Sequence, residues 1–382
     1  MIWALASVAG AYQLKRDSTG EPVCWQGAAE LVMDPASTGA LGDPAALQAA
    51  RAAVAEFVRA NGAIDLRLRE GKTRGVGYNP VGDNSSEIVV VDHDWPYDAA
   101  AIAVTVVTVD TRRHRILDAD IAFNAASRRF KVLAEDSRPG GDFDDLQNTL
   151  THELGHALGL AHNPDDQTAT MFPAARRGEV HKRTLADDDV QGLQALYPPD
   201  SAAQDVPEAQ VGCGAAPGSL APALAALLAL LALRRKGRSL HATALAALAL
   251  CAFPAAARAG EARFASAALV QTAQVVRSVT RVEDGLFITR LELRTRACAR
   301  GACPGTLEVE RLGGRIGPLE QWVDGELPPE VGAVVGVTAD ALPGRGAALR
   351  PRQASLYRMA DPREWATFTR GLREAGLRLP RP

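Results

Sequence analysis

The histidine-rich segment THELGHALGLAHNPD, residues 151–165, constrains the fold of this chain more than any other feature. His152 and His156 are four residues apart, so a helix places them on one face, one turn from each other. Gly159 has no Cβ and can adopt the left-handed conformation that ends a helix and turns the chain back. We therefore expect His162 to return to the other two histidines, so that three imidazoles bind one metal ion.

The residue types in this cluster predict a catalytic metal site. Structural zinc sites fill all four positions with protein ligands, whereas three histidines leave the fourth position for water. Glu153 follows His152 on the helix, and we expect it to hold that water and not the metal itself. The alternative is a set of ordinary surface or core histidines, but a chance match to every fixed position of His-Glu-x-x-His-x-x-Gly-x-x-His is rare. The pattern therefore favours a metal site.

Residues 12–200 are predicted to form one α+β domain with a single sheet. Residues 43–61 have apolar side chains at helical spacing, and two further helices are expected at about 144–158 and 185–198. Four runs rich in Val, Ile and Thr are typical of strands: AIDLRLRE, SEIVVVDHDW, AIAVTVVTVD and RILDADIAFN. The expected order is helix, four strands, helix, loop and helix.

Two apolar runs divide the chain. Residues 215–233 contain no charge and precede the basic cluster RRKGR, and as a helix they would be about 28 Å long, close to the hydrocarbon core of a bilayer. We expect a transmembrane segment there, after a polar linker at 201–214, with the basic cluster in the cytoplasm. Cys213-Gly214 followed by such a run resembles the C-terminal surface-sorting tags of myxobacterial exported proteins. Residues 239–257 fit a signal peptide and a membrane segment equally well. In the first case the chain is a fusion of two exported proteins. In the second case the two apolar runs form a membrane hairpin, with both flanking domains outside the cytoplasm.

The two ends of the chain favour export. Residues 1–11 resemble the end of a secretory signal peptide, although a buried first strand fits the same pattern. Residues 259–382 contain strand-like runs and are predicted to form a smaller β-rich domain of unknown function. Within it, Cys298 and Cys303 are spaced to close a small loop in an oxidising compartment. The formal net charge of -3 gives no reason to expect nucleic acid as a partner.

Three motifs between residues 148 and 198 resemble the matrixins, a family of the metzincin zinc metalloproteases. The first is the histidine motif, and the second is Met171 in ATMFP, which resembles the Met-turn beneath the zinc of that clan. The third is LADDDVQGLQALYP, which resembles the closing helix of matrixin catalytic domains. The resemblance covers about residues 22–198 and implies a metzincin-like fold, with a mixed twisted sheet and about three helices. The sequence departs from the family at Asn163, where the family more often has Ser or Thr. It also departs at Phe172, where the family more often has Tyr.

The resemblance implies a zinc-dependent endopeptidase with one catalytic zinc ion, and it leaves calcium open. His152, His156 and His162 would hold the zinc. Glu153 would take a proton from the attacking water and deliver it to the leaving amine. The remaining implied site residues are Gly159 at the turn, Met171 as the apolar floor, and Phe172 and Pro173 as the wall of the S1′ pocket.

The expected substrate is a protein or peptide that adds an extended strand to an exposed sheet edge. Residues 102–109 are the candidate edge, although their pattern fits a central buried strand equally well. We expect an exported protein at the cell surface or anchored in the membrane through residues 215–233, with its catalytic domain outside the cytoplasm. The alternative function is a non-catalytic zinc-containing adhesion or binding module in which the C-terminal domain carries the interaction.

Overall fold

The computed structural model describes two parts of the chain, which we call the first unit and the second unit. The described residues are 12–199 for the first unit, and 264–324, 327–340, 348–350 and 353–379 for the second. The predicted leader at 1–11, the linker at 201–214 and the apolar runs at 215–233 and 239–257 lie outside these ranges.

The predicted fold class included a membrane-crossing helix, and this part of the prediction is corrected. Among the described residues, no helix is both long enough and apolar enough to span a bilayer. The prediction rests on two properties of residues 215–233, their length and their lack of charge. A helix that spans a bilayer requires both properties, but the two together do not specify such a helix. The fold supported for the described residues is a mixed α/β arrangement.

The first unit is built around a mixed sheet. Its own strands are β1 (Ala29–Met33), β2 (Leu66–Glu70), β3 (Ser86–Val91), β4 (Ala103–Asp110) and β5 (Arg115–Asn124). Strands β2, β1, β3 and β5 are successive parallel neighbours, and β4 pairs antiparallel with β5. Four of these strands lie in the runs that were predicted as strands, and β1 is additional. A separate two-stranded sheet pairs β6 (Phe130–Lys131) with β7 (Asp144–Asp145).

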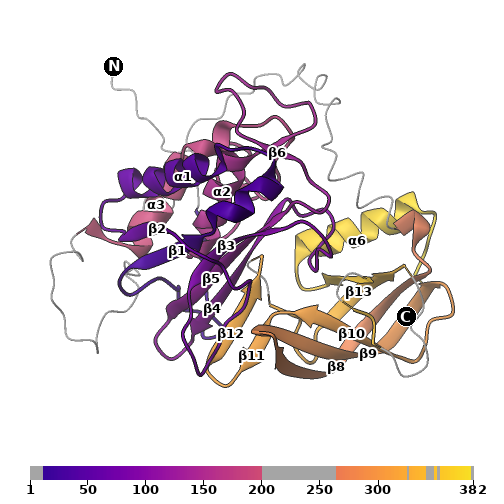
Figure 1. Ribbon diagram of the computed structural model, residues 1–382. Helices are drawn as coiled ribbons and strands as arrows, with labels where there is room; N and C mark the ends of the chain where they lie inside the picture. Colours follow the sequence, from indigo (N-terminus) through magenta and orange to yellow (C-terminus); the bar gives the residue numbers. More distant parts are fainter. Residues whose placement is uncertain (1–11, 200–263, 325–326, 341–347, 351–352, 380–382) are drawn as a thin grey trace, which may run out of the picture.

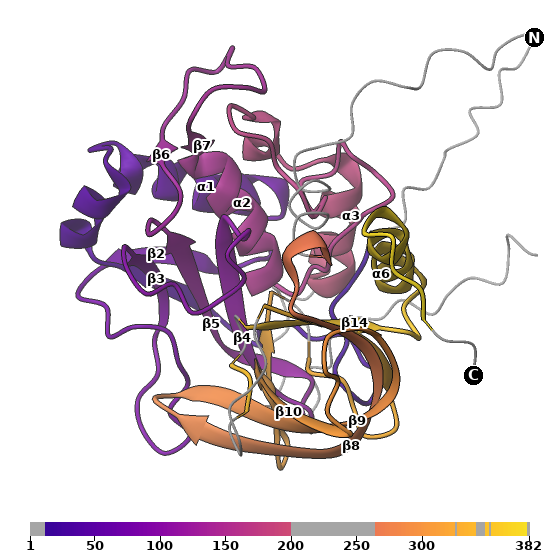
Figure 2. The same ribbon diagram turned by 90° about the vertical axis from the view of Figure 1, so that its right-hand side faces the viewer.

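The helices of the first unit share one core with its sheet. They are α1 (Ala46–Ala60), α2 (Leu146–Ala157) and α3 (Asp187–Leu196), with the short 3₁₀ helices η1 (Pro35–Leu41) and η2 (His181–Arg183). The buried side chains of α1 recur at helical spacing, which is why this segment forms an amphipathic helix against the sheet. Helix α2 packs between α1 and strands β4 and β5, and both views show it over the sheet (Figure 1, Figure 2). Buried leucines of α2 and α3 join the same core.

The second unit contains an antiparallel sheet with the order β10-β9-β8-β13-β14. Its elements are β8 (Leu269–Glu283), β9 (Leu286–Arg300), β10 (Thr306–Leu312), β13 (Val334–Ala339), β14 (Ala354–Arg358) and the helix α6 (Pro362–Glu374). Phe368 and Leu372 of α6 pack on Phe264 and on the sheet. A disulfide joins Cys298 to Cys303, with Cα atoms 5.9 Å apart, which confirms the predicted loop closure between β9 and β10.

The second unit also completes the sheet of the first. Strands β11 (Gly314–Ile316) and β12 (Leu319–Val323) extend that sheet to seven strands in the order β11-β12-β4-β5-β3-β1-β2. In Figure 1 these two orange strands lie beside β4 of the first unit. The pairing joins residues more than 200 positions apart in the chain, and no local pattern in the sequence indicates such a contact.

Candidate metal centre

Helix α2 presents the first two histidines, and its end directs the chain to the third. The helix begins at the N-cap Asp145, whose carboxylate accepts a hydrogen bond from the backbone N–H of Asn148 at 2.8 Å. After the helix, Gly159 has φ 98°, and a Cβ at this position would overlap the backbone carbonyl of Val23. Glycine is therefore required for the turn that leads to His162.

The three histidines converge as the spacing predicted. Nε2 of His162 lies 3.3 Å from Nε2 of His152 and 3.0 Å from Nε2 of His156. Two nitrogens that both bind a tetrahedral zinc ion are about 3.3 Å apart, because each Zn–N bond is about 2.0–2.1 Å long. Among the described residues, these three form the one group of His, Cys, Asp or Glu side chains close enough together to hold a metal ion. The residues present therefore fit zinc, and the calcium that the sequence left open finds no support.

The other ring nitrogens fix the orientation of two of these imidazoles. Nδ1 of His152 lies 2.7 Å from the carbonyl oxygen of Thr170, and Nδ1 of His156 lies 3.0 Å from that of Leu160. A carbonyl can only accept, so each Nδ1 carries the proton and each Nε2 keeps its lone pair for a metal. Burial lowers the pKa of all three histidines, that of His162 to about 3, which keeps the rings neutral as metal ligands must be.

Glu153 lies at the junction of α2 and the sheet. Its Oε2 accepts a hydrogen bond from the hydroxyl of Thr105, in the middle of β4, at 2.6 Å. Burial raises the pKa of Glu153 to about 8, and the negative charge of Asp324 in the second unit acts in the same direction. The sequence does not indicate Thr105 or Asp324, because both come near this glutamate only through contacts between elements that are distant in the chain.

Met171 lies beneath the helix that carries the histidines. It is almost fully buried, and a Cβ on Gly155 would overlap its sulfur atom, so α2 and Met171 are in close contact between the two helical histidines. The backbone carbonyl of Met171 accepts from the N–H of Asn163 at 2.8 Å. This bond ties Met171 to the residue that follows His162. Met171 is therefore a buried contact of α2, and its role as the apolar floor of the site stays a prediction.

Two acids of α3 hold the loop between the third histidine and Met171. Asp188 accepts from the side-chain amide of Asn163 at 2.6 Å, and Asp189 accepts from the backbone N–H of Thr170 at 2.7 Å. Thr170 is also the residue whose carbonyl orients His152. Helix α3 is thus connected to the metal centre by hydrogen bonds, and not only by packing.

The loop that carries Phe172 and Pro173 rests on a buried lysine. Phe172 is half-buried and Pro173 is exposed, and their role in an S1′ pocket remains a prediction. Nζ of Lys182 donates to the backbone carbonyls of Phe172 and Ala174. Burial lowers the pKa of Lys182 to about 8. The sequence does not indicate this residue, since a single lysine in HKR has no pattern that distinguishes it from a surface charge.

The predicted exposed edge is not an edge in the structure. Strand β4 lies between β5 and β12, and every residue of it except the last is buried. The alternative interpretation of residues 102–109, a central buried strand, is therefore confirmed. The physical reason is that valines on both faces of β4 have partners on both sides of the sheet, including the second unit.

Comparison with known proteins agrees with this geometry. Residues 89–198 match the family model described as matrixin. Matrix metalloproteinase-16 of Homo sapiens is 48% identical over 63 residues, which are 16% of this chain and 10% of that protein. Metalloendoproteinase 5-MMP of Arabidopsis thaliana is 47% identical over 53 residues, 14% of each chain, and matrilysin of Homo sapiens is 45% identical over 47 residues, 12% of this chain and 17% of that protein.

These matches cover a limited part of the molecule. The aligned segments span between about a tenth and a sixth of the length of these curated relatives. The matched family is nevertheless zinc-dependent, and the matches support a metalloprotease function for residues 89–198. The second unit lies outside the matched residues.

Proposed function

We propose that the first unit is a zinc-dependent endopeptidase that hydrolyses peptide bonds of proteins outside the cytoplasm. The observation that carries the proposal is the convergence of three Nε2 atoms at spacings that suit one tetrahedral zinc ion, next to a buried glutamate on the same helix. The disulfide between Cys298 and Cys303 supports the location, because such bonds persist in oxidising compartments.

The residues divide the chemistry between them. His152, His156 and His162 would hold zinc, which when bound supplies a Lewis acid and lowers the pKa of a water molecule. Glu153 would take the proton from the attacking water and deliver it to the leaving amine. The hydroxyl of Thr105 holds one oxygen of that carboxyl, which limits its orientation.

Replacing the proposed proton carrier tests this function. In the zinc-loaded full chain, Glu153→Gln should lower casein hydrolysis by about 10²- to 10⁴-fold, the usual contribution of a general acid–base group, with unchanged zinc content. The matched control is Glu135→Gln, the same change at an exposed glutamate, which should hydrolyse casein like the wild type.

Two results would contradict the proposal. One is casein hydrolysis that persists in Glu153→Gln or under excess chelator. The other is zinc binding without hydrolysis, both in the wild type and in a variant, Trp322→Ala, that removes a side chain of β12, the strand paired with β4. The second result would instead support the zinc-containing adhesion or binding module.

A further inference from the structure

Strand β12 occupies the position on β4 that an extended peptide would need. The two strands are antiparallel, with Trp322 opposite Val107 and Val323 opposite Val106. The pairing continues past the end of β12, where the N–H of Asp324 donates to the carbonyl of Thr105 at 2.9 Å. Thr105 is the residue whose hydroxyl contacts Glu153, so β12 runs towards the proposed catalytic glutamate and reaches its immediate neighbour.

The side chains of β12 are built into the first unit. Trp322 is 2% exposed and belongs to the same core as the buried leucines of α2, on the face of the sheet that carries the metal centre. The side-chain amide of Gln321 donates to the hydroxyl of Thr108 at 3.2 Å. Glu320 is 1% exposed and accepts from the backbone N–H of Ser18 at 3.2 Å. These are specific contacts with a sequence-defined partner strand.

We infer that residues 319–324 are a tethered peptide ligand of β4, and that an extended substrate must displace them. This inference rests on the proposed function. A sheet edge forms backbone hydrogen bonds with one strand at a time, so β12 and a substrate strand exclude each other. The second unit is thereby an internal inhibitor of the first, and a peptide binds only to the fraction of molecules in which β12 has left the edge.

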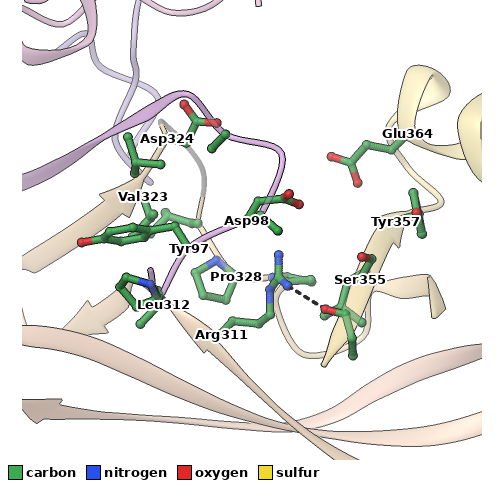
Figure 3. A pocket seen from close by; sticks show the side chains of 18 of the residues that line it. Tyr97, Asp98, Arg311, Leu312, Val323, Asp324, Pro328, Ser355, Tyr357 and Glu364 are labelled. Atoms are coloured by element: carbon green, nitrogen blue, oxygen red, sulfur yellow. Dashed lines mark hydrogen bonds between the residues drawn. The ribbon is translucent and has the colours of Figure 1, made fainter. Parts of the chain in front are cut away.

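The contact between the units is open on one side of the sheet. Beyond Asp324 lies a cavity of about 640 Å³, lined by Tyr97 and Asp98 of the first unit and by Arg311, Leu312 and Tyr357 of the second (Figure 3). The contact is therefore not close-packed on this side of the sheet. Elsewhere the contacts between the units include an exposed ion pair of Arg363 with Asp165, which contributes little to stability, and a hydrogen bond from the N–H of Tyr78 to the carbonyl of Gly285 at 2.9 Å.

Removing the indole of β12 tests the inference in the zinc-loaded full chain. The probe is an extended peptide that ends in a hydroxamate, so that its peptide part overlies β12 while its end reaches the metal. Trp322→Ala should bind this probe at least about tenfold more tightly than the wild type, because the open fraction rises. Trp365→Ala is the matched control, since it makes the same change on α6, away from β4, and should bind like the wild type. Acetohydroxamic acid, which needs no sheet edge, should bind all three proteins equally.

A covalent lock provides the converse test and does not depend on how Trp322→Ala folds. Thr108 and Gln321 are directly opposite each other, within the range that a disulfide bridges. The oxidised double variant Thr108→Cys, Gln321→Cys should not bind the peptide hydroxamate, whereas its reduced form should bind it like the wild type. Equal affinity of the wild type, Trp322→Ala and the oxidised double variant would overturn the inference. Casein hydrolysis separates the two proposals, because its absence in every variant, with the binding pattern intact, rejects the peptidase and leaves the tethered ligand in place.

Discussion

At the scale of single residues, the metal centre depends on a few positions where backbone geometry permits one residue type. Gly159 combines a positive φ with a backbone carbonyl where its Cβ would lie. The spacing of the histidines predicts this turn, because the residues that form it follow one another closely in the chain. Thr105 and Lys182 were not predictable in the same way, since they approach the site from other elements and have no local spacing to indicate it.

Substituting the turn glycine should therefore affect both stability and metal binding. Gly159→Ala should destabilise the chain by at least about 2 kcal/mol, since it adds a steric overlap to an unfavourable backbone conformation. It should also weaken zinc binding, because the turn directs His162 to the other ligands. The control is Gly62→Ala, where a Cβ meets no atom within 4 Å and the change in stability should stay within about 0.5 kcal/mol. Urea unfolding and zinc titration of both variants are the measurements, and an unperturbed Gly159→Ala would refute this account of the turn.

At the scale of elements, strands β3 and β5 are joined by buried acids as well as by their backbone ladder. Asp118 of β5 accepts from the hydroxyl of Ser86 in β3 at 3.2 Å, and Asp120 accepts from the backbone N–H of Glu87 at 2.8 Å. Burial raises the pKa of both acids, that of Asp118 to about 7. The folded state therefore keeps a proton that the unfolded chain releases near the ordinary value of 3.8.

This linkage predicts a pH dependence of stability. Because the folded pKa of Asp118 is above its unfolded pKa, the free energy of unfolding should fall as pH rises from about 4 to about 7. Asp118→Asn should show a smaller fall, while Asp142→Asn, a change at an exposed acid, should follow the wild type. Denaturant unfolding at both ends of this range checks the slope, and identical slopes in all three proteins would disprove the assignment.

The boundaries of the elements show what sequence patterns determine. The helix expected at 43–61 is Ala46–Ala60, and the one expected at about 144–158 is Leu146–Ala157, because amphipathic spacing and capping residues are local properties. The pairing of β12 with β4 is a property of two distant segments that only the folded chain brings together. The predicted strand pattern of β4 was correct, and its predicted place at the edge was wrong for this reason.

At the scale of the whole molecule, the shared sheet couples the stability of the two units. Trp322 belongs to the core of the first unit although its strand belongs to the second, so the core of the first unit is not complete without the second. We expect the full chain to unfold in one cooperative transition, with near-ultraviolet circular dichroism and zinc release giving the same midpoint. Trp322→Ala should separate the two signals, whereas Trp365→Ala should not. Two separate transitions in the wild type would show that the units are independent.

The strand that crosses from one unit to the other also decides what happens when the backbone is cut. A nick anywhere between residues 200 and 263 cuts the peptide backbone between the units but leaves every hydrogen bond between β12 and β4 in place. The two fragments should consequently copurify as a stoichiometric complex and come apart only in denaturant that contains a reductant. Processing at such a position would not release a free enzyme, because the cleaved piece would remain bound to the other as a separate subunit.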